Sequence, residues 1–327
     1  MRHKTPLIQL LTAWLVVAAL AAPAWVTAAQ PYPAKPVRIV VGFTPGTTTD
    51  ITARALAQAL TPRFGQQVIV ENREGANSGI ANSIVARANP DGHTILIGTL
   101  SLVVSPLLYK ELPFDPKDLA PVSLVVLTQN VICVNPKVEA TSIRELIALA
   151  RSRPGELNYA SGATGGTPHL AAELFKSMAK VNIVRITYKG SGQALTDMLA
   201  GHLQVSFPNA GGAASYISSG RLRALAVTAA HPSALFPKLP TVSASGLPGY
   251  EAGVLNGIFV PARTPAAVVR RLNQEIVLAL SRPDVKDKLF TTGVEAVGSP
   301  PERLTEAMKA DMTVWGKLIR ELGIRNE

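Results

Sequence analysis

The sequence predicts an α/β fold organised as two domains, and three observations lead to this prediction. Short β-branched runs alternate with amphipathic stretches along most of the chain, which is typical of mostly parallel sheets flanked by helices. A strand, a loop of small hydroxyl-bearing and glycine residues, and a helix follow one another twice, at distant positions. Two proline-rich stretches, residues 112–121 and 232–248, bracket a central block with strands and helices of its own.

The expected strands are short, apolar and rich in β-branched residues. We place them at residues 37–43, 67–71, 94–98, 131–135, 157–161, 183–188, 203–207, 223–228, 254–260 and 295–297.

The expected helices carry recognisable start signals or one apolar face. In the stretch 51–64, Ile51, Ala55 and Leu56 share a face with Ala59 and Leu60. The sequence SIRE at 142–145 is a capping box that opens a helix over 143–151. Thr264 followed by Pro265 predicts a capped helix through about residue 281, and further helices are expected at 169–179 and 300–322.

The proline-rich stretches suggest that the central block is a domain inserted into another. We predict that residues 30–126 and 252–327 form domain 1 and that residues 127–251 form domain 2. The chain then crosses twice, near residues 123–130 and 249–257. Two crossings make a hinge that can open and close around a cleft.

The first residues are typical of an export signal. Arg2 and Lys4 precede the almost continuously apolar stretch 7–22, and small residues follow it. We expect a Sec-type signal peptide over residues 1–29, cleaved near Ala28 or Ala29, with a retained membrane anchor as the alternative. The mature protein is then expected in the periplasm.

Charge and composition narrow the class of ligand. The formal net charge is +10, and removal of Arg2 and Lys4 with the signal lowers it to +8. Lys and Arg are scattered, so nucleic acid is not an expected partner, although a mild positive field would attract small anions. The single Cys133 lies in an apolar run, and the histidines are isolated. We therefore expect no disulfide, no metal and no cofactor.

The first strand–loop–helix junction spans residues 44–50, and its sequence is TPGTTTD. Free backbone N–H groups and the positive end of the helix dipole make such a junction an anion site. Thr47 and Thr48 add hydroxyl groups. The alternative is a capped helix behind a polar loop, and we expect Asp50 to face its own helix as a cap. Phe43 could cover an apolar part of a ligand or belong to the core.

The second junction spans residues 162–169, and its sequence is GATGGTPH. Thr167 is expected as the N-cap and Pro168 as the first helical residue. Glycines here let the backbone approach a ligand. His169 is either a neutral packing side chain or a hydrogen-bond partner of the ligand. Two such junctions far apart in the chain suggest a ligand gripped from two sides.

Two other strand exits could line the same edge of the first sheet. These are residues 72–77 and residues 98–101, which end in Ser101. Ligands gather at the carboxyl ends of parallel strands in open α/β sheets. A structural turn is the alternative at both places.

An exported serine hydrolase is the competing hypothesis. Ser161, His169 and Asp197 could be drawn as a triad, and Ser191 is a second candidate nucleophile. The chain contains no G-x-S-x-G elbow, phosphate-binding loop or dinucleotide fingerprint. The sequence therefore favours a binding protein over an enzyme.

Sequence tags along the mature chain resemble the Bug-type substrate-binding proteins of tripartite tricarboxylate transporters. They include KPVRIVV (35–41), VENR (70–73), PDGHT (90–94), LNYAS (157–161), GGTPHL (165–170), YKGS (188–191) and LRALAVT (222–228). Any one tag is weak, but the set occurs in order across essentially the whole mature chain.

The resemblance implies a periplasmic two-domain Venus-flytrap fold (type 2) and a non-catalytic receptor for a small organic carboxylate. It implies membrane subunits of a tripartite transporter as candidate partners, and we expect a monomer. Carried over by position, with Ser101 added from its strand exit, the ligand-binding candidates are Phe43, Thr47, Thr48, Asp50, Ser101, Ser161, Thr164, Gly166, Thr167, His169, Tyr188 and Asn209.

The chain also departs from the family pattern. A glycine run is frequent in the family where this chain has Thr47 and Thr48, so the resemblance implies side-chain as well as backbone contacts here. A frequent aspartate before the position of Asn209 is replaced by Pro208. Without that acid a ligand ammonium loses a partner, which favours a carboxylate that is not an amino acid.

Overall fold

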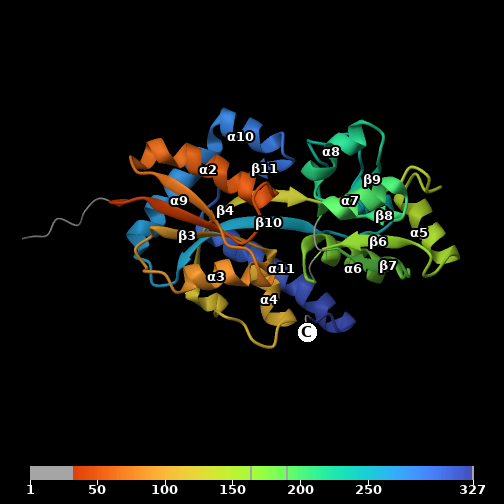
Figure 1. Cartoon of the computed structure of the whole chain (residues 1–327), viewed down its shortest axis with the longest axis horizontal. Helices are drawn as coiled ribbons and strands as arrows, with labels where there is room; N and C mark the ends of the chain where they lie inside the picture. Colours follow the sequence, from red (N-terminus) through yellow and green to blue (C-terminus); the bar gives the residue numbers. More distant parts are fainter. Residues whose placement is uncertain (1–31, 163, 189–190, 326–327) are drawn as a thin grey trace, which may run out of the picture.

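The computed structural model describes residues 32–162, 164–188 and 191–325, so the expected signal peptide lies outside the described residues. Two sheets flanked by helices lie side by side, and the long strands β4 and β10 of the six-stranded sheet run toward the other sheet (Figure 1). We call the six-stranded sheet with its helices the first lobe and the five-stranded sheet with its helices the second lobe. The expected α/β fold is confirmed.

The first sheet has the strand order β11-β4-β10-β3-β1-β2. Its parallel half consists of β1 (Val37–Val41), β2 (Val68–Asn72) and β3 (Thr94–Thr99). Its antiparallel half consists of β10 (Gly253–Pro261), β4 (Leu119–Gln129) and β11 (Val294–Ala296).

The second sheet has the order β7-β6-β8-β5-β9. In it β6 (Asn158–Ser161) runs parallel to β7 (Val184–Thr187) and β8 (Val205–Ser206). The strand β5 (Val131–Val134) runs antiparallel to β8 and to β9 (Arg223–Val227). Both sheets are thus mixed rather than mostly parallel, because the strands next to the crossings reverse direction.

The longest strand, β4, is absent from the sequence prediction. Residues 112–121 were expected to be a proline-rich connection and residues 123–130 only a crossing. In the structure Pro121 lies inside β4 opposite Phe259, beside an irregularity in the register of β4 and β10. A proline without an N–H group is tolerated at such irregular positions. The exact domain boundaries stay a prediction.

Helices cover both sheets. The first lobe contains α2 (Thr48–Phe64), α3 (Gly79–Ala86), α4 (Leu100–Leu108), α9 (Ala266–Ser281), α10 (Pro283–Phe290) and α11 (Pro301–Leu322). The second lobe contains α5 (Ile143–Ser152), α6 (Thr167–Ala179), α7 (Ser191–Ala200) and α8 (Ala210–Ser218). Short 3-10 turns occupy Ala76–Ser78, Pro116–Asp118 and Ser243–Ser245.

Helix caps follow the sequence signals in part. Ser142 caps α5 by accepting from the N–H of Glu145, as expected. At α6 the N-cap is Gly166, so the expectation that Thr167 caps this helix is wrong by one residue. The cap of α9 is likewise Pro265, and Thr264 instead donates to the carbonyl of Pro261.

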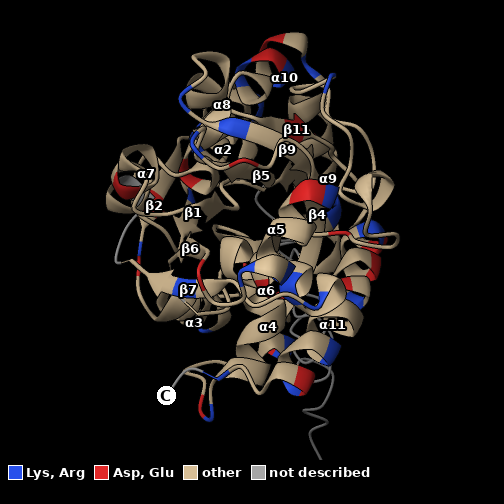
Figure 2. Ribbon diagram, turned by 90° about the vertical axis from the view of Figure 1, so that its right-hand side faces the viewer, with Lys and Arg blue, Asp and Glu red and all other residues tan. Residues whose placement is uncertain are grey.

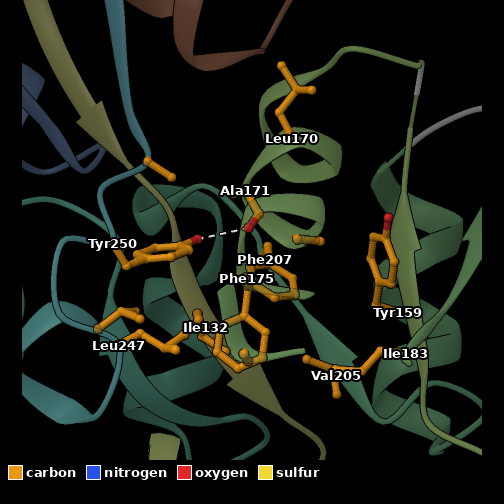
Figure 3. Close-up of a cluster of buried hydrophobic side chains, with 14 of the residues drawn as sticks. Ile132, Tyr159, Leu170, Ala171, Phe175, Ile183, Val205, Phe207, Leu247 and Tyr250 are labelled. Carbon is orange, nitrogen blue, oxygen red and sulfur yellow. Dashed lines mark hydrogen bonds between the residues drawn. The ribbon is translucent and has the colours of Figure 1, made fainter. Parts of the chain in front are cut away.

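One hydrophobic cluster joins the two lobes. The aromatic rings of Tyr159, Phe175, Phe207 and Tyr250 form its centre in the second lobe, where the Tyr250 hydroxyl donates to the carbonyl of Ala171 at 2.9 Å (Figure 3). The same cluster includes buried residues of α4 and α11, among them Trp315. Closely packed apolar surface therefore connects the lobes beside the crossing strands.

Among the residues that the structure describes, no helix combines the length and apolar character needed to cross a bilayer. Acidic and basic residues alternate along the ribbon of several helices in Figure 2.

Candidate functional site

The first junction connects β1 to α2, and its own side chains organise it. Thr47 is the N-cap of α2 and accepts from the N–H of Asp50 at 3.4 Å. Its hydroxyl also donates to the carbonyl of Thr44 at 2.9 Å. Thr48 begins the helix and is half-buried. The tip of the loop, residues 44–46, is exposed.

Asp50 lies beneath this loop and is 2 % exposed. Its carboxylate accepts from the N–H of Gly46, from Arg54 and from the side-chain amide of Asn72, each at 2.9 Å. Burial alone would raise the pKa of Asp50, but these hydrogen bonds and the charge of Arg54 hold it below its ordinary value. The N-cap is Thr47 rather than Asp50, which lies in the first turn of α2. The carboxylate of Asp50 does face its own lobe, as expected, because all three of its partners belong to that lobe.

The second junction connects β6 to α6, and Arg185 of β7 reaches across it. The guanidinium donates to the hydroxyl of Ser161 at 2.6 Å, to the carbonyl of Gly162 at 2.9 Å and to the hydroxyl of Thr164 at 3.3 Å. Within the described part of the chain, no carboxylate lies at ion-pair distance from this guanidinium. Among the described residues, the guanidinium of Arg185 at the second junction therefore has no ion-pair partner.

His169 supports the same loop from inside the helix. It is 3 % exposed, and its Nδ1 accepts from the N–H of Gly165 at 3.1 Å. Burial, with the charge of Arg185 acting in the same direction, lowers the pKa of His169 to about 4. The side chain is therefore neutral at pH 7, which agrees with the packing alternative raised from the sequence.

The segment Ala76–Ser78 lies close to the start of the first junction and to Gly165 of the second. A Cβ built on Gly42, just before the first junction, would lie 2.4 Å from Oγ of Ser78. A Cβ built on Gly165 would lie 3.7 Å from Nδ2 of Asn77 and 2.1 Å from a methyl of Leu108. Glycine at position 165, with φ of 78°, is thus what lets the second junction approach the first lobe.

The other candidates have partners within the fold. Asn72 donates to the carbonyl of Phe43, whose half-buried ring packs on the first-lobe core. The hydroxyl groups of Ser101 and Thr99 lie 3.0 Å apart in the first turn of α4. Tyr188 donates to Asp197 at 2.6 Å, and Asn209 caps α8. Ligand contact by any of these residues stays a prediction.

Two residues near the junctions are absent from the sequence prediction. Arg185 follows an alternating pattern in a short strand, and only the pairing of β7 with β6 places it beside Ser161. Asn77 ends a loop that the sequence marks as a strand exit, without indicating its side chain. For Arg185, the available signal is a lone basic residue between the apolar Val184 and Ile186.

The remaining reactive groups of the structure lie elsewhere. Cys133 is fully buried, and burial raises the pKa of its thiol to about 12. No group of three metal-ligating side chains occurs among the described residues. A cavity of about 380 Å³ lies between α11 and the strands β4 and β10, and none of its lining residues belongs to either junction. Burial raises the pKa of Asp311 in its wall to about 7.

Comparison with known proteins agrees with this architecture. The model of the tripartite tricarboxylate transporter family receptor matches residues 52–324. The protein BugT of Bordetella pertussis is 34% identical over 326 residues, which cover 99% of each chain.

Solved structures extend the likeness to the fold. The Rhodopseudomonas palustris protein Rpa4515, described with adipate, has a TM-score of 0.81 and 35% identity, covering 89% of this chain and 98% of its own. MatC of the same organism, described with bound malate, has a TM-score of 0.77 and 26% identity, covering 88% of this chain and 100% of its own. The chain thus belongs to the receptor family of the tripartite tricarboxylate transporters.

Proposed function

We propose that this protein is an extracytoplasmic solute receptor that binds a small organic carboxylate between its two lobes. The observation that carries the proposal is the second junction, where the guanidinium of Arg185 lies beside Ser161 and Thr164 and has no ion-pair partner in the described part of the chain. Hydrogen bonds between ionised partners are about twice as strong as neutral ones, and a guanidinium matches carboxylate geometry. The segment Ala76–Ser78 brings the first lobe against this junction.

The relatives support the class of ligand. Rpa4515 and MatC are described with adipate and malate, which are small dicarboxylates without an amino group. The absence of an acid at Pro208 points the same way, because a ligand ammonium would lack that partner. The proposed ligand is therefore a carboxylate that is not an amino acid.

The proposal includes export and a role in uptake or sensing. The first 29 residues have the character of a cleaved Sec signal peptide, which would deliver the receptor to the periplasm. In uptake, a monomeric receptor would deliver its ligand to membrane subunits of a tripartite tricarboxylate transporter. In sensing, the ligand-bound form itself would be the signal.

Hydrolysis by Ser161 is not proposed, because none of its hydrogen-bond partners among the described residues can act as a base. Its Oγ accepts a hydrogen bond from Arg185, and the Nδ1 of His169 is occupied by the N–H of Gly165. A nucleophilic serine needs an acceptor that takes its proton, and a guanidinium cannot do so. We therefore propose a receptor without catalytic activity.

The test is a thermal-shift and calorimetry series on the purified mature protein. Adipate, malate and succinate are compared with their neutral diesters, which keep the carbon skeleton but remove the charge. We expect saturable 1:1 binding of at least one carboxylate, with a melting temperature that rises with ligand concentration by mass action. An absence of any shift at millimolar carboxylate, or equal shifts with the diesters, would overturn the proposal. Ester turnover lost in Ser161→Ala would favour the hydrolase instead.

A further inference from the structure

The segment Ala76–Ser78 has an unusual backbone. Its three consecutive non-glycine residues have φ values of 46°, 49° and 72°. This left-handed region costs roughly 1–2 kcal/mol per residue that carries a Cβ, although asparagine tolerates it better than most. Three such residues in a row therefore need a reason, and glycine would occupy the same backbone with less strain.

One side chain in this segment is committed to the fold. Ser78 is buried, and its hydroxyl donates to the carbonyl of Gly42 at 3.4 Å. It packs so closely on Gly42 that no Cβ fits there. Ser78 thus fastens the segment to the start of the first junction.

Asn77 faces the opposite way, toward the second lobe. Its Nδ2 is shielded from solvent and has no hydrogen-bond partner among the described residues. The same atom lies 3.7 Å from the position of a Cβ on Gly165. A buried donor without an acceptor costs free energy of folding. We therefore expect an acceptor outside the protein, on a bound ligand.

We propose that Asn77 is a specificity-determining residue whose side-chain amide donates a hydrogen bond to a carboxylate oxygen of the bound ligand. The inference rests on the proposed function and adds a contact from the first lobe to the one proposed for Arg185. Glycine at position 77 would relieve the backbone strain but would also remove the side-chain amide that donates to the ligand. This requirement for the amide explains why the strained residue is retained. The ligand oxygen then satisfies an amide that is unpaired in the free protein.

Two variants and a matched control test this role. Asn77→Gly removes both the strain and the donor, so the free protein should melt at a higher temperature while adipate or malate binds ten- to a hundredfold more weakly. Asn77→Asp keeps the shape but replaces a donor with a negative acceptor, and its loss of affinity should be larger. Ala76→Gly, at an exposed neighbour with φ of 46°, should raise the melting temperature and leave affinity unchanged.

The outcomes separate ligand recognition from a structural role. Asn77→Gly that binds like the parent, or that loses stability together with affinity, overturns the proposal. Tighter binding by Asn77→Asp would mean that the ligand presents a hydrogen-bond donor, and not a carboxylate oxygen, to position 77, and that result also overturns the proposal. The parent protein is titrated first. If it binds no carboxylate, the proposed function fails and this inference fails with it, whereas a binding parent with indifferent variants contradicts only the role of Asn77.

Discussion

The two strand–loop–helix junctions share a design and differ in the charge that holds them. At the first junction the buried carboxylate of Asp50 accepts a hydrogen bond from the loop, at the N–H of Gly46. The half-exposed Arg54 neutralises the charge of this carboxylate. At the second junction the guanidinium of Arg185 donates hydrogen bonds to the loop, and neutral His169 accepts one from the loop. Similar sequence patterns thus produce one neutral junction and one positive junction.

This difference assigns unequal tasks to the two loops. A ligand anion near the first junction meets helix N–H groups and an Asp50–Arg54 ion pair that carries no net charge. An anion near the second junction meets the guanidinium of Arg185, which pairs with no described carboxylate. We therefore expect the second junction to supply most of the electrostatic attraction and the first to supply shape and hydrogen bonds.

The largest expected effect separates the two guanidinium groups. Arg185→Met should weaken carboxylate binding about a hundredfold, because a hydrogen bond to a charged group is worth roughly 1.5–3 kcal/mol and the loop loses its support as well. Arg54→Met is the matched variant at the first junction and should cost less than tenfold. Calorimetric titration of both variants with the same carboxylate measures the difference.

The variant Arg185→Lys is the control that separates loss of the positive charge from loss of loop order. Lysine keeps the charge but cannot hold Ser161, Gly162 and Thr164 at once. An intermediate affinity is expected for Arg185→Lys, since the electrostatic attraction for the carboxylate remains while the set of guanidinium hydrogen bonds to the loop is lost. Equal losses in Arg54→Met and Arg185→Met would mean that the charge difference between the junctions has no part in binding.

A second, smaller effect tests whether the first junction approaches the ligand at all. Thr48→Asp places a negative charge in the first turn of α2, and we expect affinity to fall tenfold or more while the fold survives. Thr48→Asn has nearly the same shape without the charge and should lose little. If Thr48→Asp binds as well as the parent in the same titration, the first junction is not part of the anion site.

The sequence predicted what is local and missed what depends on pairing between distant segments. The strands at 37–43 and 157–161, the capping box at Ser142 and both junction loops follow from spacing and turn chemistry. The strand β4 was missed because Pro121 interrupts its pattern, which only the irregular register with β10 accommodates. Arg185 was missed because its position beside Ser161 arises from the pairing of β6 with β7.

The N-caps show the same limit at a finer scale. Thr167 and Thr264 are good caps by residue type, yet each observed N-cap is a neighbour of the expected one. The caps are Gly166 for α6 and Pro265 for α9. At α6 the loop is held by Arg185 and His169 instead of by a capping hydroxyl. Tertiary contacts therefore outweighed a preference worth roughly 1 kcal/mol.

The last prediction concerns His169, for which we expect no effect on ligand affinity and a pH-dependent effect on the stability of the fold. The folded pKa of about 4 lies below the ordinary value of about 6.5, so the unfolded chain binds the extra proton in this range. Stability should therefore rise from about pH 4 to about pH 6.5 and be fully present above that. The contribution of His169 is up to about 3 kcal/mol at about 1.4 kcal/mol per pKa unit.

The variant His169→Asn keeps an acceptor near the position of Nδ1 and removes the titrating group. Urea unfolding at intervals between pH 4 and pH 8 should show a smaller rise in the free energy of unfolding for the variant than for the parent. Carboxylate affinity between pH 6 and pH 8 should be flat in both proteins, because neutral His169 acts on the loop through Gly165. A parent affinity that rises as the pH falls through 6.5 would place a protonated His169 on the ligand and reverse the roles assigned to His169 and Arg185.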